Sequence, residues 1–141
     1  MADALFDPGR EGFLAGEIDW NTATIKVSLI RGYAFSGAHR FVSDATGAGA
    51  VLVSTQTLTS PTVTAGVADA ADVTFPAVPT GTACTALIIY QASAVGGGAD
   101  VAATAQRLIA YVDSASGLPV TPNGGNINLT FDSGANRIFK L

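Results

Sequence analysis

The side chains best suited to chemistry in this sequence are one histidine and one cysteine, which lie far apart along the chain. His39 is flanked by Ala38 and Arg40, whereas Cys84 lies in a strongly apolar run. A zinc site needs three or four nitrogen or sulfur ligands. A serine triad needs a nucleophile beside a histidine base, and no Gly-x-Ser-x-Gly elbow occurs to present one. We therefore expect no catalytic residue, no metal ligand and no cofactor.

The acidic residues and a glycine triplet also lack the spacing of a ligand-binding motif. The eleven acidic residues fall mostly in predicted turns, and the Asp-x-Asp-x-Asp spacing of a calcium loop does not occur. A Walker phosphate loop ends in lysine followed by serine or threonine, and no lysine lies between Lys26 and Lys140. We interpret Gly96–Gly98 as the tip of a mobile loop between two strands, where a partner can be touched. The sequence predicts that the protein is not an enzyme.

Aromatic and terminal apolar residues are the better candidates for a functional surface. Three uses compete for the aromatic residues, namely the core, a protein interface and a carbohydrate-binding face. The residues concerned are Trp20, Tyr33, Phe35, Phe41, Tyr90 and Tyr111. Both ends of the chain are apolar or aromatic, and chain ends are often disordered unless they dock. We predict that at least one end docks onto a neighbouring subunit, through an interface that comprises Leu5, Phe6, Phe13, Trp20, Phe41, Ile138, Phe139 and Leu141.

The composition indicates that partners cover part of the surface. Apolar residue types make up 48% of the 141 residues and charged types only 13%, whereas an ordinary soluble domain carries about 25% charged residues. The formal net charge is -4 and the basic residues are scattered singly, so we expect neither nucleic acid nor a membrane surface as a partner. No apolar run approaches the ~20 residues of a membrane helix. We expect the protein to associate with copies of itself, as a homodimer or small homo-oligomer.

Eight segments have the residue types or the alternating period of β-strands. These strands must position the candidate interface side chains. Turn residues separate them at short intervals, and most links are too short for a crossover helix, which favours antiparallel pairing. The pattern predicts one domain over residues 1–141, an all-β, jelly-roll-like antiparallel β-sandwich of about eight strands. The expected strands are Thr24–Leu29 (half-buried), Ala50–Leu58, Pro61–Val67, Ala71–Val78, Thr82–Gln91 (central), Arg107–Asp113, Gly125–Phe131 and Asn136–Leu141.

One or two short helical turns are also expected. Residues 1–19 form an N-terminal arm in which Asp7 is a candidate N-cap, Pro8 suits the first turn and Glu11 complements the helix dipole. Gly37–Asp44 is either a short helix or a long irregular loop, and Ala99–Gln106 can add a second turn. A turn is expected at residues 132–134.

Several strings resemble those of the capsid cement, or decoration, proteins of short-tailed bacteriophages such as those infecting Bordetella. The resemblance is carried by Leu5–Trp20 leading into Thr24–Leu29, by Val63–Phe75, by Arg107–Asp113 and above all by Gly117–Leu141. It covers most of the chain, but the segment Gly32–Leu58 and the glycine loop do not contribute.

The resemblance implies a jelly-roll-like sandwich on the outer surface of a capsid, where it clamps neighbouring subunits of the major capsid protein and pairs about two-fold axes. It also implies a virion location after synthesis in the host cytoplasm, and the N-terminus lacks the basic and apolar regions of a secretion signal. A neck or tail component of the virion and a carbohydrate- or receptor-binding module are the alternatives.

Overall fold

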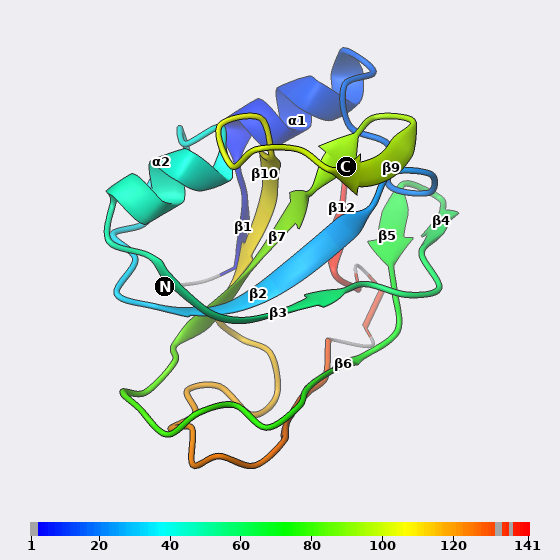
Figure 1. Cartoon of the computed structure of the whole chain (residues 1–141). Helices are drawn as coiled ribbons and strands as arrows, with labels where there is room; N and C mark the ends of the chain where they lie inside the picture. Colours follow the sequence, from blue (N-terminus) through cyan, green and yellow to red (C-terminus); the bar gives the residue numbers. More distant parts are fainter. Residues whose placement is uncertain (1–2, 132–133, 136) are drawn as a thin grey trace.

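Strands dominate the computed structural model, which describes residues 3–131, 134–135 and 137–141 (Figure 1). Strands make up 39% of the chain and helices 10%, and the sheets are antiparallel, so the predicted all-β class is confirmed. The described residues form twelve strands and two helices. They are β1 (Ala4–Leu5), α1 (Asp7–Leu14), β2 (Ile25–Arg31), α2 (Val42–Gly47), β3 (Val51–Thr57), β4 (Thr62–Thr64), β5 (Val67–Asp69), β6 (Val73–Phe75), β7 (Ala86–Gln91), β8 (Ser93–Ala94), β9 (Gly97–Asp100), β10 (Arg107–Val112), β11 (Ile127–Leu129) and β12 (Phe139–Lys140).

The main sheet has five antiparallel strands in the order β1-β10-β7-β2-β3. All six residues of β7 are buried between β10 and β2, which confirms the predicted central strand. The prediction of a half-buried strand over Thr24–Leu29 is wrong in one respect, because Ser28 on its polar face is buried. The Ser28 hydroxyl satisfies its hydrogen-bonding capacity at 2.6 Å from Thr55 Oγ1 and 3.3 Å from Tyr90 Oη, so its burial is tolerated.

Both faces of the main sheet are covered. On one face, Val27, Leu29 and Ile89 join a large buried cluster with residues of β5, β6, β11 and β12. On the other face, Ile30 and Ile88 pack in a second cluster with residues of α2 and the N-terminal arm. Three small antiparallel sheets complete the described fold, with the orders β11-β6, β12-β5-β4 and β8-β9. Four strands exceed the predicted eight, because the predicted strand 61–67 belongs to a β4–β5 hairpin, the arm contributes β1, and the segment after β7 forms the β8–β9 hairpin.

The helix in the N-terminal arm is longer than the expected turn, and Phe6 rather than Asp7 precedes it as the N-cap residue. Two glycines inside α1 are buried because the helix packs closely on its neighbours. A Cβ on Gly9 would lie 2.8 Å from the Leu108 carbonyl oxygen, and one on Gly12 would lie 2.6 Å from Ile18 Cδ1. Glycine therefore lowers helix propensity here, but Gly9 allows α1 to contact β10 and Gly12 allows it to contact Ile18.

The ambiguous segment Gly37–Asp44 leads into α2, which covers the second face of the sheet (Figure 1). The Asp44 carboxylate accepts hydrogen bonds from the backbone N–H groups of Arg40 and Phe41, both at 2.9 Å. The segment Ala99–Gln106 contains one short turn, in which the backbone N–H groups of Ala105 and Gln106 both donate to the Ala102 carbonyl.

The predicted loop between two strands lies between β7 and β10, and the structure adds that its glycine triplet belongs to a β8–β9 hairpin. The hairpin packs on the segment before β2, where the Thr24 N–H donates to Ser93 Oγ at 2.9 Å. A Cβ on Gly97, whose φ is +90°, would lie 2.8 Å from the Thr22 carbonyl oxygen. Of the predicted C-terminal elements, residues 132–133 of the turn and residue 136 of the last strand lie outside the described residues, and β12 begins at Phe139.

Candidate functional site

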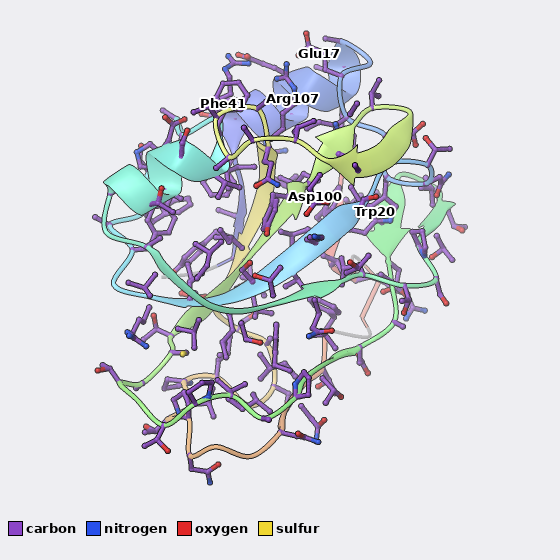
Figure 2. All side chains as sticks on the ribbon, in the orientation of Figure 1. Glu17, Trp20, Phe41, Asp100 and Arg107 are labelled. Carbon is purple, nitrogen blue, oxygen red and sulfur yellow. The ribbon has the colours of Figure 1, made fainter. Side chains whose placement is uncertain are left out.

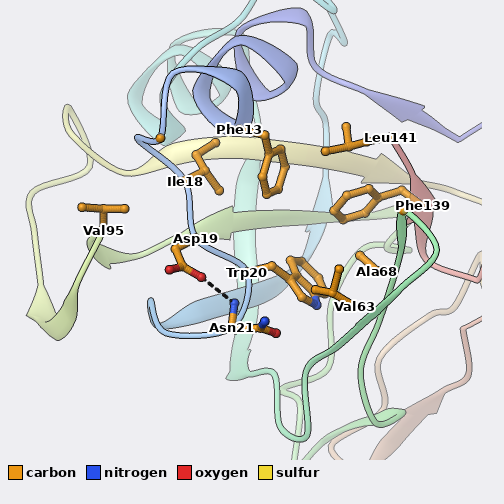
Figure 3. A pocket seen from close by; sticks show the side chains of 12 residues that line it. Phe13, Ile18, Asp19, Trp20, Asn21, Val63, Ala68, Val95, Phe139 and Leu141 are labelled. Atoms are coloured by element: carbon orange, nitrogen blue, oxygen red, sulfur yellow. Dashed lines mark hydrogen bonds between the residues drawn. The ribbon is translucent and has the colours of Figure 1, made fainter.

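Four of the eight predicted interface residues line one apolar hollow, although they come from both ends of the chain (Figure 3). Phe13 is contributed by α1, Trp20 by the segment before β2, and Phe139 and Leu141 by the C-terminal end. The hollow has a volume of about 290 Å³. Its remaining lining residues are Gly16, Ile18, Asp19, Asn21, Val63, Gly66, Ala68 and Val95. We call this feature the apolar hollow.

Three aromatic rings form the floor of the apolar hollow. The Phe139 ring lies between the other two, with its centroid 5.7 Å from that of Phe13 and 5.1 Å from that of Trp20. The Trp20 and Phe139 rings are nearly perpendicular, at 87°, which is a favourable edge-to-face geometry. Trp20 Nε1–H donates to the Asp69 carbonyl at 3.1 Å, so its indole is held in one orientation.

The rim of the apolar hollow exposes large apolar side chains to solvent. Val63 is 54% exposed and Leu141 is 55% exposed, and Val95 also lines the hollow. Leu14 ends α1 beside Gly16 and is 89% exposed. Contiguous exposed apolar surface is typical of protein-binding sites. Three of the five large apolar side chains that are exposed in the described chain therefore belong to this one hollow.

Hydrogen bonds fix the wall of the apolar hollow that runs from Glu17 to Thr22. The buried Gln91 side chain accepts from the Asp19 N–H at 2.9 Å and donates to the Glu17 carbonyl at 2.9 Å. The Asp19 carboxylate accepts from the backbone N–H groups of Asn21 and Thr22. Hydrogen bonding by the Thr22 side chain, and then by these N–H groups, lowers the pKa of Asp19. Gln91 was not a sequence candidate, because its position in an apolar run indicates only a strand.

A second hollow adjoins the first and is lined by basic side chains. Arg10, Arg137 and Lys140 line it together with Asp3, and its volume is about 340 Å³. Leu5 and Ile138, two further predicted interface residues, also belong to its lining. Phe139 lines both hollows, so β12 lies between them. We call this feature the basic hollow. Six of the eight predicted interface residues thus line two neighbouring hollows.

The other two predicted interface residues do not join this site. Phe6 is fully buried in the second core cluster and offers no surface to a partner in this conformation. Phe41 lies beneath Arg107, whose Cζ is 5.6 Å from the ring centroid and whose Nη2 is 2.8 Å from Glu17 Oε2 (Figure 2). In the described part of the chain, Arg107 Nη1 is the one buried side-chain polar atom without a hydrogen-bond partner.

The remaining aromatic candidates pack on one another. The centroid of the Phe35 ring lies 4.8 Å from that of Tyr111 and 6.0 Å from that of Tyr33. Tyr90 is buried. The Tyr33 hydroxyl lies 2.7 Å from His39 Nδ1, and burial raises the pKa of Tyr33 to about 12. The histidine therefore has a structural contact with an aromatic cluster.

The described residues contain no group of three or more His, Cys, Asp or Glu side chains arranged to hold a metal ion. Cys84 is buried, and burial raises its pKa. Within the same described part of the chain, neither helix is long and apolar enough to cross a membrane. No protein-family model, curated protein or solved structure matches this chain.

Proposed function

We propose that this chain is a structural protein of a bacteriophage virion, which binds the outer surface of the capsid and stabilises it by bridging subunits of the major capsid protein. The observation that carries the proposal is the pair of adjoining hollows, where apolar residues from both chain ends meet beneath a rim of exposed apolar side chains. The resemblance of the sequence to capsid cement proteins names the class of partner. The role requires no chemistry beyond binding.

Mass action explains how such a protein stabilises a shell. A molecule that binds only the assembled capsid stabilises it by its binding free energy, and many copies that each touch more than one subunit multiply the effect. The low charge of the chain is suited to this task, because few ionised groups have to lose water when a partner covers the surface. Pairing with a second copy belongs to the same proposal.

The proposal includes a jelly-roll-like arrangement of the sheets. The large buried cluster supports it, because side chains of the main sheet meet residues of β5, β6, β11 and β12 there, as between the two layers of a sandwich. A sandwich of this kind presents its loops and chain ends at the periphery, where a neighbouring subunit can be gripped.

Binding to particles that lack the protein tests the proposal. Purified protein is titrated onto such particles, and bound copies are counted from quantified gel bands after sedimentation. Val63→Glu places a carboxylate at the rim of the apolar hollow, and we expect it to weaken binding by about tenfold or more because the charge must be desolvated. Val51→Glu is the matched control, since Val51 is 46% exposed on a strand and lines neither hollow.

Particles with bound protein should also survive heating better than bare particles. Wild-type protein that fails to bind, or two valine variants that bind as well as wild type, would contradict the proposal. A few bound copies per particle, in place of a complete surface lattice, would indicate the neck or tail.

A further inference from the structure

We infer that the two hollows together bind an acidic segment of the partner protein, which places an apolar side chain in the apolar hollow and carboxylates beside Arg10 and Lys140. The inference rests on the proposed function and adds the chemistry of the partner. It follows from where the unpaired positive charges of this acidic chain lie.

Arg10, Arg137 and Lys140 are three of only seven basic residues in a chain of net charge -4, and all three line the basic hollow. The side chains of Arg10 and Lys140 are exposed, and neither side chain has an ion-pair or hydrogen-bond partner among the described residues. Arg137 is 3.5 Å from Asp69 Oδ2 and remains 47% exposed. Two unpaired cations therefore share one hollow.

The other basic residues make the contrast clear, because three of them already have a carboxylate partner elsewhere on the molecule. The pairs are Lys26 with Asp100, Arg40 with Glu11 and Arg107 with Glu17. Among the described residues, three basic side chains have no carboxylate partner, and two of them, Arg10 and Lys140, line the basic hollow, whereas Arg31 lies outside both hollows. An interface commonly meets such a patch with groups of the opposite charge.

The one acid in the lining of the basic hollow, among the described residues, already accepts hydrogen bonds from other groups. The Asp3 carboxylate accepts from the N–H groups of Asp113 and Ser114 at 2.9 and 3.1 Å, and it also bonds the Ser114 hydroxyl. Its two oxygens are therefore directed at the turn after β10. The hollow keeps an excess of positive charge that a carboxylate from outside can neutralise.

The cations and the apolar hollow are close enough to engage one segment. Arg10 and Phe13 are three residues apart on α1, so they project from the same side of the helix into the two hollows. Phe139 lines both hollows. The Lys140 side chain lies along Gly66, a residue of the apolar hollow, with Cγ and Cε 3.9 Å from the position of a Gly66 Cβ.

The combination favours a polypeptide over a phosphate-bearing partner. A nucleic acid needs an extended basic surface, whereas this chain is acidic overall and its unpaired cations flank an aromatic floor. An acidic segment with one apolar anchor uses both hollows, with the anchor supplying most of the affinity and the carboxylates fixing its position.

The test compares the double variant Arg10→Gln/Lys140→Gln with wild type in the particle-binding titration, at low and at moderate salt. Both side chains are exposed and unpaired, so the variant should unfold at the wild-type temperature. At low salt we expect the affinity of the double variant for particles to be about tenfold lower, because two partly screened charge pairs with the partner are lost. Its binding should also depend less on salt concentration. Arg31→Gln, which changes a cation outside both hollows, should bind within about twofold of wild type.

The outcomes separate this inference from the function on which it rests. Wild-type protein that binds particles, with a double variant that binds equally well and has the same salt dependence, overturns the acidic segment and leaves the proposed function intact. Wild-type protein that does not bind overturns the function itself. Binding that disappears when the particles are treated with nuclease identifies nucleic acid as the ligand and also overturns the inference.

Discussion

The close approach of α1 to β10 predicts that Gly9→Ala destabilises the protein, although alanine is the better helix former. A Cβ at this position would lie 2.8 Å from the Leu108 carbonyl oxygen and 3.2 Å from Ile109 Cα. Both atoms belong to the backbone of β10, which is paired on one side with β1 and on the other with β7. Because pairing with both neighbours holds β10 in place, we expect α1 to move away from it and to lose packing contacts.

The expected magnitude follows from two opposing terms. Forcing an extra carbon into a packed contact costs about 1–3 kcal/mol, and replacing glycine by alanine within a helix returns up to about 1 kcal/mol. We expect a net loss of about 1–2 kcal/mol in the free energy of unfolding. In a chain of this size, each kcal/mol corresponds to about 4 °C in Tm.

Urea unfolding and thermal melts of three helical glycine variants test this reasoning. Gly47→Ala is the matched control, because nothing lies within 4 Å of a Cβ at that position in α2, and we expect no loss of stability. Gly12→Ala should fall between the two, since its Cβ would meet the end of the Ile18 side chain, which can rotate away. A Gly9→Ala protein as stable as the Gly47→Ala protein would refute the close packing of α1 on β10.

Two further predictions concern the candidate site and the acid side of the stability profile. Trp20→Phe removes the hydrogen bond to the Asp69 carbonyl, so the free energy of unfolding should fall by about 1–2 kcal/mol in urea titrations; an unchanged midpoint would show that the indole N–H has no stabilising partner. The Phe41 and Arg40 N–H groups lower the pKa of Asp44 below its ordinary value of 3.8. Its contribution is therefore complete above that value and is lost as the pH falls through the lowered folded-state pKa. Asp44→Asn should flatten the decline of the urea midpoint in this acid range, and equal declines in both proteins would contradict the assignment.

Local patterns predicted those elements whose burial repeats along the chain. Ile127, Leu129 and Phe131 are buried and Asn128 is exposed, as the alternation in Gly125–Phe131 indicates. A continuous apolar run predicts the strand β7, because a strand that is buried on both faces needs apolar residues at successive positions. These features depend on residues that are close in sequence, so the amino-acid sequence is enough to predict them.

Patterns of glycine were less informative, because the same residue serves opposite purposes. Gly9 and Gly12 indicate a poor helix, yet Gly9 allows α1 to reach β10 and Gly12 allows it to pack on Ile18. Gly97 and Gly98 indicate a loop, yet their positive φ values of +90° and +100° belong to a hairpin that packs on the segment before β2. Whether a missing side chain means freedom or close contact depends on what lies opposite.

The sequence by itself determined the all-β class, the scarcity of charge and the apolar character of both chain ends. The tertiary structure decided that Phe13, Trp20 and Phe139 share one floor, that Phe6 is withdrawn into the core, and that Arg10 lies with Lys140 in one hollow. The physical reason is that the alternation of residue types along a strand indicates only the face of the sheet to which each side chain points. The meeting of two chain ends depends on the path of all the strands between them.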